Sequence, residues 1–385
     1  MDIKKIISEM TLEEKLLMLG GQDGWHFYGV ERFGIPAIRV CDGPHGIRVH
    51  TDQNEVYLPA TNFPTASAMA STFNPQLIHL AGKTIGEECR HYGVQVLLGP
   101  GVNGKRSPLA GRNFEYYSED PYLSGKIAAA FINGVQSNKV GTSLKHYIAN
   151  EQETSRLFIS SKVDERTLRE IYLTPFQMAI EEANPWTIMG SYNRINGVYG
   201  CENDHTLNTI LKGQLKYDGL VVSDWGAVND KVESHKYGLD IQMPGPVDID
   251  ERLKQAVLNG EIPMAVIDDH VTRCLRLHER VFKPGDTVDT DLDKNHETAQ
   301  KVAAESIVLL KNEKILPLKK NTKIAVIGRF ADDQVRYNGG GSSWMLAHKI
   351  ERPLEALKAK AKVIYASAYD QEKVTKKTET EALAA

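Results

Sequence analysis

The stretch GLVVSDWG, residues 219–226, decides how the rest of the chain is interpreted. Leu220–Val222 is a short apolar run rich in β-branched residues, which is typical of a parallel strand buried on both faces. Asp224 and Trp225 follow directly, and in barrels and open α/β sheets this end of a strand carries the functional groups. Asp is also a common helix N-cap, so the stretch alone leaves a capping role for Asp224 equally open.

The size and charge of the chain limit its class. Its 385 residues are enough for two or three domains. Hydrophobic residues are 41% and charged residues 25% of the chain, which is ordinary for a soluble globular protein. A formal net charge of -4 provides no electrostatic basis for binding nucleic acid or an acidic membrane surface. Since no stretch approaches the ~18 apolar residues of a membrane-spanning helix, and the N-terminus lacks a signal-like apolar core, we expect no membrane partner.

Cysteine and histidine spacing argues against a metal or another cofactor. The four cysteines are far apart and lack CxxC spacing, which favours a reducing compartment over a zinc site or a disulfide framework. The histidines show no HExxH spacing, and the Gly-rich stretch 339–342 lacks the Lys of a Walker phosphate loop. We therefore predict a cytoplasmic protein without cofactors, and the oligomeric state stays open.

Strand and helix patterns alternate along most of the chain. The expected strands are 38–40, 94–98, 143–146, 187–189, 220–222 and 239–243, and the expected helices are 74–92, 120–137, 164–182, 205–215, 250–258 and 266–281. This alternation predicts an α/β fold with a parallel sheet covered by helices, and a closed (β/α)8 barrel takes about 250 residues. No GxGxxG follows the first strand, and polar groups follow several strands, so a TIM-like barrel is favoured over a dinucleotide-binding sheet.

A second, smaller unit follows the sequence KPGD at 283–286, which indicates a linker. The expected elements after it are a helix over 299–310, strands at 323–328 and 362–366, a flexible loop at 338–343, and helices at 354–361 and 374–385. Two strands are too few for an independent α/β domain, so this unit is expected to be incomplete.

Charged, polar and aromatic side chains gather at the ends of the predicted strands and in two loops. They are Asp42, Lys145, His146, Tyr192, Asp224 and Trp225 at strand ends, with Arg112 and Arg156 in the loops. Sugars need hydrogen bonds from carboxylates and cations to neighbouring hydroxyls, and an aromatic surface for their C–H face. This combination therefore favours a polyhydroxylated ligand.

Each residue also has a purely structural explanation. His146 could be a buried core histidine, and Tyr192 could be ordinary core. Lys145 could pair with Glu151 at the surface, and Arg112 could pair with Glu115. Their common placement at strand ends makes a functional site the favoured interpretation.

Six motifs resemble glycoside hydrolase family 3, in its β-glucosidase branch. They are DGPHGIR (42–48), GRNFEYYSEDPYLSG (111–125), KHYIANEQETSR (145–156), MGSYNRING (189–197), GLVVSDWGAV (219–228) and GLDIQMPG (238–245). AAESIVLLKN (303–312), LPL (316–318) and GGGS (339–342) resemble the start of that family's second domain. The resemblance implies a TIM-like barrel over 1–284, a linker and start of the second domain over 285–320, and the first part of an α/β sandwich domain over 321–385.

The resemblance also implies a retaining double displacement on terminal β-D-glucosyl residues of a β-glucoside or oligosaccharide. Asp224 matches the family nucleophile, Trp225 would form a wall of the sugar site, and Asp42 would accept hydrogen bonds from sugar hydroxyls. The other matching sugar-binding positions are Arg112, Lys145, His146, Arg156 and Tyr192, with Ser342 as a contact from the Gly-rich loop of the second domain. Cations near Asp224 would keep its carboxylate ionised.

The chain departs from the family pattern at the proton donor. In the β-glucosidase branch this is a Glu on a later loop of the second domain, beyond residue 385, so we expect a chain truncated relative to the family and impaired on ordinary β-glucosides. The β-N-acetylglucosaminidase branch uses a His in a KHFPGHG-like signature, whereas this chain has KHYIANEQE at 145–153. That branch, a β-xylosidase and a non-catalytic sugar-binding fragment are the open alternatives.

Overall fold

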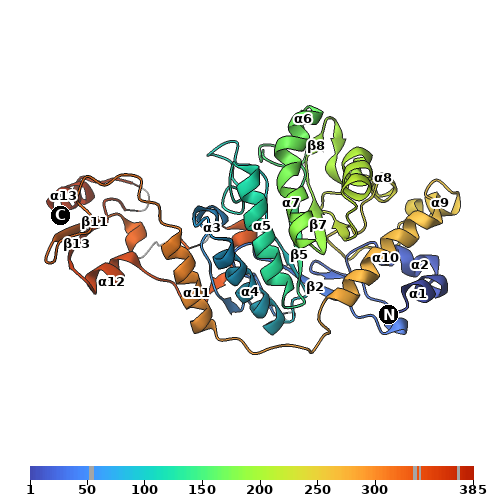
Figure 1. The fold of residues 1–385 in the computed structure, drawn as a ribbon, viewed down its shortest axis with the longest axis horizontal. Helices are drawn as coiled ribbons and strands as arrows, with labels where there is room; N and C mark the ends of the chain where they lie inside the picture. The colour runs from blue at the N-terminus through green and yellow to red at the C-terminus, as the bar shows by residue number, and fades with distance from the viewer. Residues whose placement is uncertain (52–55, 333–335, 338–339, 371–372) are drawn as a thin grey trace.

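The computed structural model describes the chain from residue 1 to residue 385 except 52–55, 333–335, 338–339 and 371–372. The predicted loop at 338–343 therefore lies partly outside the described residues, at Asn338 and Gly339. A larger unit contains the main sheet, and a smaller unit follows it at the C-terminal end (Figure 1).

A curled sheet of six strands forms the centre of the larger unit, counting the described residues. Its order is β1 (His26–Phe27), β2 (Ile38–Asp42), β4 (Val96–Leu98), β5 (Gly141–Tyr147), β7 (Thr187–Gly190) and β10 (Leu220–Val222). β1 is antiparallel to β2, and all the other neighbours are parallel. Every residue of β4, β5, β7 and β10 is buried, as expected for parallel strands covered on both faces.

The prediction of a regular (β/α)8 barrel is supported only in part, because the described residues form a six-stranded half-barrel. In place of the strand predicted at 239–243, single bridges join Val222 to Ile241 and Gly20 to Gln242, and a further bridge joins Gly21 to Phe27 of β1. Asp240 provides one reason why this segment does not pair as a full strand with β10. Its Oδ2 accepts the backbone N–H of Val221 at 2.6 Å, and a continuous strand pairing would use that same donor. Pro244 and Pro246 then provide no backbone donors.

Helices cover the sheet. They are α1 (Ile3–Glu9), α2 (Leu12–Leu17), α3 (Ala66–Ser71), α4 (Pro75–His91), α5 (Pro121–Gln136), α6 (Glu165–Thr167), α7 (Thr174–Ala183), α8 (Lys231–Lys236), α9 (Glu251–Leu258) and α10 (Met264–Arg280). α5 packs between α4 and α7 (Figure 1). Asn74 and Asp164, the first residues of two predicted helices, are N-caps whose side chains accept backbone N–H groups at the starts of α4 and α6. The segment predicted as one helix over 164–182 is divided by a π-helix, Leu168–Leu173, and a second π-helix, His205–Gln214, replaces the α-helix predicted at 205–215.

α11 (Leu292–Glu305) corrects the predicted helix at 299–310. It begins earlier, with Asp291 as its N-cap, and it ends at Glu305. Its buried residues Ala299 and Val302 face α4, against which α11 packs. The apolar run at 307–310 lies outside the helix and is exposed, because no described part of the chain covers it.

The smaller unit contains a parallel pair of strands, β11 (Lys323–Ile327) and β13 (Lys362–Ala366), with α12 (Pro353–Lys358) and α13 (Lys376–Ala384) beside β13. Both predicted strands are confirmed. The sequence did not predict β12 (Leu346–Ala347). This strand lies between β11 and β13 in the sequence, but it pairs in parallel with β3 (Pro59–Ala60) of the larger unit. The small β6 (Ser160–Ser161), β8 (Arg194–Ile195) and β9 (Val198–Tyr199) form a separate sheet.

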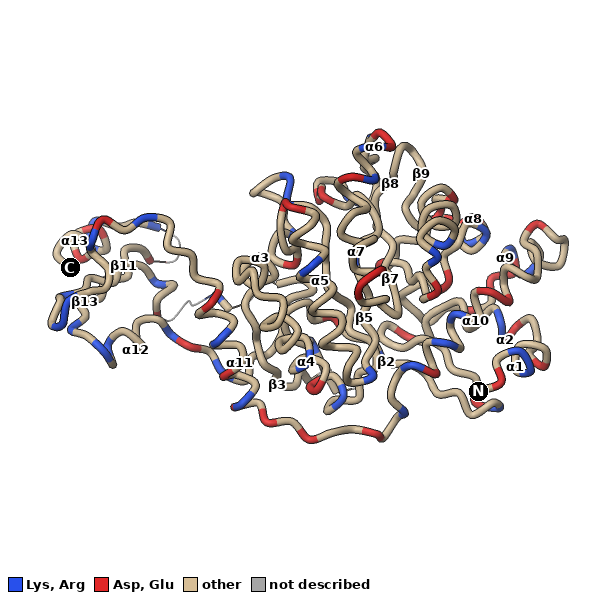
Figure 2. The backbone as a smooth tube through the Cα atoms, in the orientation of Figure 1, with Lys and Arg blue, Asp and Glu red and all other residues tan. Residues whose placement is uncertain are grey.

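Basic and acidic residues are intermixed along the described chain, as Figure 2 shows. None of the helices in the described ranges is long and apolar enough to cross a membrane.

Candidate functional site

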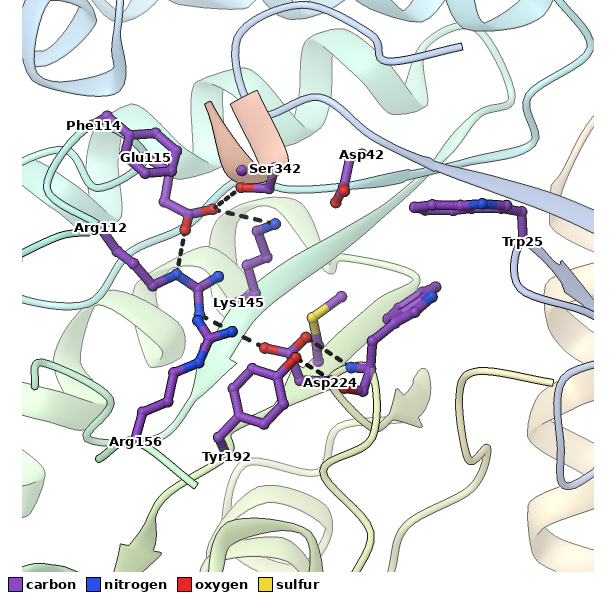
Figure 3. A pocket seen from close by; sticks show the side chains of 13 residues that line it. Trp25, Asp42, Arg112, Phe114, Glu115, Lys145, Arg156, Tyr192, Asp224 and Ser342 are labelled. Atoms are coloured by element: carbon purple, nitrogen blue, oxygen red, sulfur yellow. Dashed lines mark hydrogen bonds and ion pairs between the residues drawn. The ribbon is translucent and has the colours of Figure 1, made fainter. Parts of the chain in front are cut away.

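A cavity of about 310 Å³ lies where the parallel strands end (Figure 3). Eight residues singled out in the sequence line it: Asp42, Arg112, Lys145, Arg156, Tyr192, Asp224, Trp225 and Ser342. His146 is fully buried and contacts two of these residues without lining the cavity itself. Sequence reasoning did not select the other lining residues, Trp25, Phe114, Glu115, Met189 and Gly341.

Asp224 follows β10, lines the cavity, and has one carboxylate oxygen that is buried without a hydrogen-bond donor from the described residues. Its Oδ1 accepts the backbone N–H of Trp225 at 2.8 Å. Its Oδ2 accepts no hydrogen bond from the described residues, and it lies 3.7 Å from Arg112 Nη1 and 3.5 Å from His146 Nε2. The helix-capping alternative is wrong, because the N-cap of α8 is Asp230.

Glu115 is the centre of a buried ion-pair cluster beside Asp224. Its Oε1 accepts from Arg112 Nε, and its Oε2 lies 3.3 Å from Lys145 Nζ. Burial opposes ionisation of Glu115, but the charges of Lys145 and Arg112 outweigh it and lower its pKa to about 2. Lys145 therefore pairs with Glu115 in the interior and not with Glu151 at the surface.

His146 holds Arg112 from behind the cavity. Arginine only donates hydrogen bonds, so His146 Nε2 accepts from Arg112 Nη2 and the proton of the neutral ring sits on Nδ1. Nδ1 then donates to the hydroxyl of Tyr116 at 3.0 Å. Burial lowers the pKa of His146 well below its usual value, and the charges of Arg112 and Lys145 lower it further. The imidazole ring of His146 is therefore neutral.

Tyr192 and Arg156 form another side of the cavity. The guanidinium carbon of Arg156 lies 4.5 Å from the centre of the Tyr192 ring, and Arg156 Nη1 donates to Glu153 Oε2 at 3.0 Å. The hydroxyl of Tyr192 donates to the carbonyl oxygen of Trp225 at 3.0 Å. Burial and the charge of Asp224 raise the pKa of Tyr192, so its hydroxyl stays protonated.

Two aromatic rings form the wall opposite Arg112. The rings of Trp25 and Trp225 are 5.7 Å apart between centroids. Trp225 is fixed by its indole N–H, which donates to the carbonyl oxygen of Gly24 at 2.9 Å. Trp25 gave no signal in the sequence because it lies far from the strand-end motifs.

Asp42 and Ser342 complete the lining. Asp42 ends β2 and lies 3.8 Å from Arg48 Nη1. Burial raises the pKa of Asp42 to about 6, although the charge of Lys145 acts in the opposite direction. Ser342 comes from the C-terminal part of the chain, and its hydroxyl donates to Glu115 Oε2 at 2.9 Å.

A separate group of two buried residues, Asp240 and His270, and the exposed Asp269 has the donor types of a metal site among the described residues. Asp240 Oδ1 lies 2.7 Å from Lys212 Nζ, and Asp269 Oδ2 accepts from Arg273 Nε at 2.8 Å. Because these cations already occupy the carboxylate oxygens, the group does not fit a metal ion.

The chain belongs to glycosyl hydrolase family 3. The model described as the family's N terminal domain matches residues 28–277, and the model of its C-terminal domain matches residues 307–385. The family is one of glycoside hydrolases. Most residues that line the cavity lie within the first match; Gly341 and Ser342 lie within the second, and Trp25 lies just before the first.

Individual relatives agree with this assignment. Thermostable beta-glucosidase B of Acetivibrio thermocellus is 45% identical over 96% of this chain and 50% of the relative. An exo-alpha-(1->6)-L-arabinopyranosidase of Bifidobacterium longum is 45% identical over 91% of this chain and 48% of the relative. The chain thus spans about half the length of the curated relatives it matches.

Solved structures show the same fold. The GH3 beta-glucosidase of Bifidobacterium adolescentis superposes with a TM-score of 0.91 at 42% identity, over 98% of this chain and 56% of the other. Beta-glucosidase 3B of Thermotoga neapolitana, in complex with alpha-D-glucose, superposes with a TM-score of 0.86 at 36% identity, over 100% of this chain and 57% of the other.

Proposed function

We propose that this chain carries the nucleophile half of a retaining β-glucosidase that hydrolyses terminal non-reducing β-D-glucosyl residues. The observation that carries the proposal is the carboxylate of Asp224. Its Oδ2 is buried at the end of β10 without a hydrogen-bond donor from the described residues, and it lies 3.7 Å from Arg112 Nη1. A guanidinium at this distance is a partner for a carboxylate, the group that acts as nucleophile in a retaining glycosidase.

In the first step, Asp224 Oδ2 would attack the anomeric carbon and form a glycosyl-enzyme ester. The bond from that carbon to the leaving oxygen breaks, and the leaving oxygen takes a proton from a second carboxyl group about 5–5.5 Å from the first. In the second step, the second group, now a carboxylate, would take a proton from water while the water oxygen attacks the same carbon. The ester bond to Asp224 breaks, which releases the sugar and the carboxylate of Asp224.

Neither other carboxyl group of the cavity suits the donor role. Glu115 has a pKa of about 2 and stays ionised between two cations, so it has no proton to give. Asp42, with its pKa raised to about 6, could carry a proton, but it matches the family position that accepts hydrogen bonds from sugar hydroxyls, so we assign it to sugar binding. As the family resemblance implies, we assign the donor to a Glu of the second domain outside the present sequence.

The remaining lining residues would hold the sugar. Lys145, Arg112 and Arg156 supply donors, Asp42 supplies an acceptor, and Trp225 supplies a ring for the C–H face. His146 would act through Arg112. Ser342 would add a contact from the second domain.

The domain division proposed with this function is a TIM-like barrel over 1–284, a linker and domain start over 285–320, and the first part of an α/β sandwich over 321–385. The single bridges at 20–21 and 241–242 support the closed barrel, since they run between β10 and β1, the two edges of the sheet. The parallel pair β11 and β13 supports the sandwich start.

The test uses reagents that need no proton donor. A 2,4-dinitrophenyl 2-deoxy-2-fluoro-β-D-glucoside carries a good leaving group, so we expect a burst of dinitrophenol and a covalent adduct on Asp224 by peptide mass spectrometry. Asp224→Asn should show neither, and Asp230→Asn, which changes the nearby cap of α8, should keep both. A burst equal to that of Asp224→Asn, with no adduct, would refute the nucleophile assignment. Reversible sugar binding without an adduct would support the non-catalytic alternative.

The sugar specificity has a second candidate. The relative named as an arabinopyranosidase is as similar to this chain as the thermostable beta-glucosidase is. Arabinopyranose keeps the pyranose ring but lacks the hydroxymethyl group of glucose. The dinitrophenyl α-L-arabinopyranoside, run beside the glucoside, decides between them through the ratio of kcat/KM values.

A further inference from the structure

The backbone of Lys145 and His146 is held by the loop that follows β4. In the ladder of the described residues, the pairing of β5 with β7 shifts register at these two residues, directly after Leu144. On the other side, the backbone N–H of Lys145 donates to the carbonyl oxygen of Pro100 at 2.9 Å, and the carbonyl oxygen of Lys145 accepts the backbone N–H of Val102 at 2.8 Å. The loop after β4 therefore extends the pairing of that strand as far as Lys145.

One side chain, Asn103, continues this support to His146. Its Oδ1 accepts the backbone N–H of His146 at 2.8 Å, and its Nδ2 donates to the carbonyl oxygen of His146 at 3.0 Å. Nδ2 also lies 3.3 Å from Oε1 of Glu151, which accepts the backbone N–H of Gly104 at 3.2 Å. Because a backbone N–H only donates and a carbonyl oxygen only accepts, the amide of Asn103 has one possible orientation, and it satisfies both backbone groups of His146.

Asn103 is connected to Asp224 through His146 and Arg112. The side chain of Asn103 is 1% exposed and lies outside the residues that line the cavity. His146 Nε2 accepts from Arg112 Nη2, and Arg112 Nη1 lies 3.7 Å from Asp224 Oδ2 (Figure 3). His146 Nε2 is itself 3.5 Å from the same carboxylate oxygen. A shift of the His146 backbone would therefore move both nitrogen atoms relative to Asp224.

We propose that Asn103 is a positioning residue for the reaction of Asp224. By binding both backbone groups of His146, it fixes the ring that orients Arg112, and so it holds the guanidinium beside the carboxylate. This inference rests on the proposed function, since it needs Asp224 to attack a sugar. A displacement of about 1 Å in an active site lowers a reaction rate by up to about a hundredfold. A role in stability alone would change how much protein folds and leave the rate in the folded molecules unchanged.

The burst of dinitrophenol from the 2,4-dinitrophenyl 2-deoxy-2-fluoro-β-D-glucoside separates these two roles. Its amplitude counts the molecules that react, and its rate constant at saturating reagent describes the reaction within each of them. We expect Asn103→Ala to lower the rate constant about ten- to hundredfold, while the amplitude still matches the folded fraction measured by tryptophan fluorescence. Asn103→Asp keeps the size and the acceptor for the His146 N–H but removes the donor to the His146 carbonyl oxygen, so it should also lower the rate constant, by about tenfold.

The matched control is Asn295→Ala, which removes another buried amide beside a carboxylate. Asn295 is 6% exposed, and its Nδ2 donates to Oε1 of Glu88 at 2.8 Å, where α11 packs against α4. This substitution should lower the free energy of unfolding and keep the rate constant of the burst.

A second comparison tests whether Asn103 acts through the ring of His146. Asn103→Ala is made in a protein that already carries His146→Ala, in which the backbone of residue 146 is still present but the ring is absent. Substitutions that act through one group are not additive, so the further loss of rate should be about threefold or less. A purely structural role predicts the same loss with and without the ring.

Three results would overturn the inference. They are an unchanged rate constant in Asn103→Ala or, if that variant does not fold, in Asn103→Asp; an equal loss of rate in Asn295→Ala; and an equal loss from Asn103→Ala with and without the ring of His146. If the unsubstituted chain shows neither a burst nor an adduct, the proposed function fails together with this inference. A normal burst that the Asn103 variants keep at full rate contradicts the inference alone.

Discussion

The substitution Glu115→Gln removes the charge around which the cavity is assembled. The Glu115 side chain is buried, contacts Arg112 Nε and lies 3.3 Å from Lys145 Nζ. Gln keeps the size and a hydrogen-bond acceptor, but it leaves two buried cations without their common partner. Breaking a buried ion pair in this way costs about 3–5 kcal/mol, because the remaining charge is desolvated and unpaired. We expect the free energy of unfolding at pH 7 to fall by about 3 kcal/mol.

The pKa of Glu115 provides an independent magnitude and a pH dependence. Burial opposes ionisation, but Lys145 and Arg112 outweigh it and lower the pKa from 4.5 to about 2. One pKa unit corresponds to about 1.4 kcal/mol, so this fall is also worth about 3 kcal/mol. A carboxylate whose pKa is lower in the folded state than in the unfolded state contributes its full stabilisation of the folded state above the unfolded-state pKa. This contribution is lost as the pH falls toward the folded-state pKa. The difference between the two proteins should therefore shrink as the pH drops from 4.5 toward 2.

Urea unfolding followed by tryptophan fluorescence, at pH 7 and at pH 3, measures both effects. The matched control is Glu182→Gln, which breaks an exposed ion pair in which Glu182 Oε1 lies 2.6 Å from Lys126 Nζ. It should change stability little, because exposed pairs are screened by water. A loss for Glu115→Gln no larger than that of the control at pH 7, or an equal loss at pH 7 and pH 3, would refute the reasoning.

Three other substitutions test separate parts of the structure by urea unfolding. Burial raises the pKa of Asp42 from 3.8 to about 6, so wild-type stability should fall as the pH rises through this range. Asp42→Asn should therefore gain about 3 kcal/mol relative to wild type between pH 4 and pH 8, and a constant difference would contradict this. Asp240→Ala leaves Lys212 buried without its partner at 2.7 Å and should cost about 3–5 kcal/mol; an unchanged midpoint would contradict the burial of that ammonium. Gly134→Ala places a Cβ 2.2 Å from the carbonyl oxygen of His79, where α5 approaches α4, and should cost about 1–3 kcal/mol; an unchanged midpoint would mean that the helices can separate freely.

The residues at strand ends were predictable because their signal is local. Asp42, Tyr192 and Asp224 each follow a short apolar run, and the carboxyl ends of parallel strands meet at one edge of a sheet. Lys145 was predicted at a strand end too, and the structure places it within β5. All four line the cavity, while their chemical roles stay predictions.

The pairings between these residues were not predictable in the same way. Sequence reasoning offered Glu151 as the partner of Lys145, but the partner is Glu115, which was considered only as a partner of Arg112. Trp25 had no local signal at all, and it reaches the cavity through its contact with Trp225. Such contacts depend on how distant segments pack, which short-range patterns do not encode.

The extent of elements also depended on packing. The apolar residues at 307–310 continue a helical pattern in the sequence, but α11 ends at Glu305, and its last buried residue is Val302. The pattern at 239–243 resembled a strand, and the side chain of Asp240 takes the backbone donor that a ladder would have used.

The sequence by itself determined the alternation of strands and helices, the family, and the group of polar residues that follow the strands, because apolar periodicity and strand-end position are properties of adjacent residues. Only the tertiary structure decided which charges pair, how far the sheet closes, and that Ser342 reaches Glu115 across 227 positions of the chain. The physical reason is that burial sets the strength of a charge pair and the availability of a backbone donor, and burial exists only once distant segments have packed together.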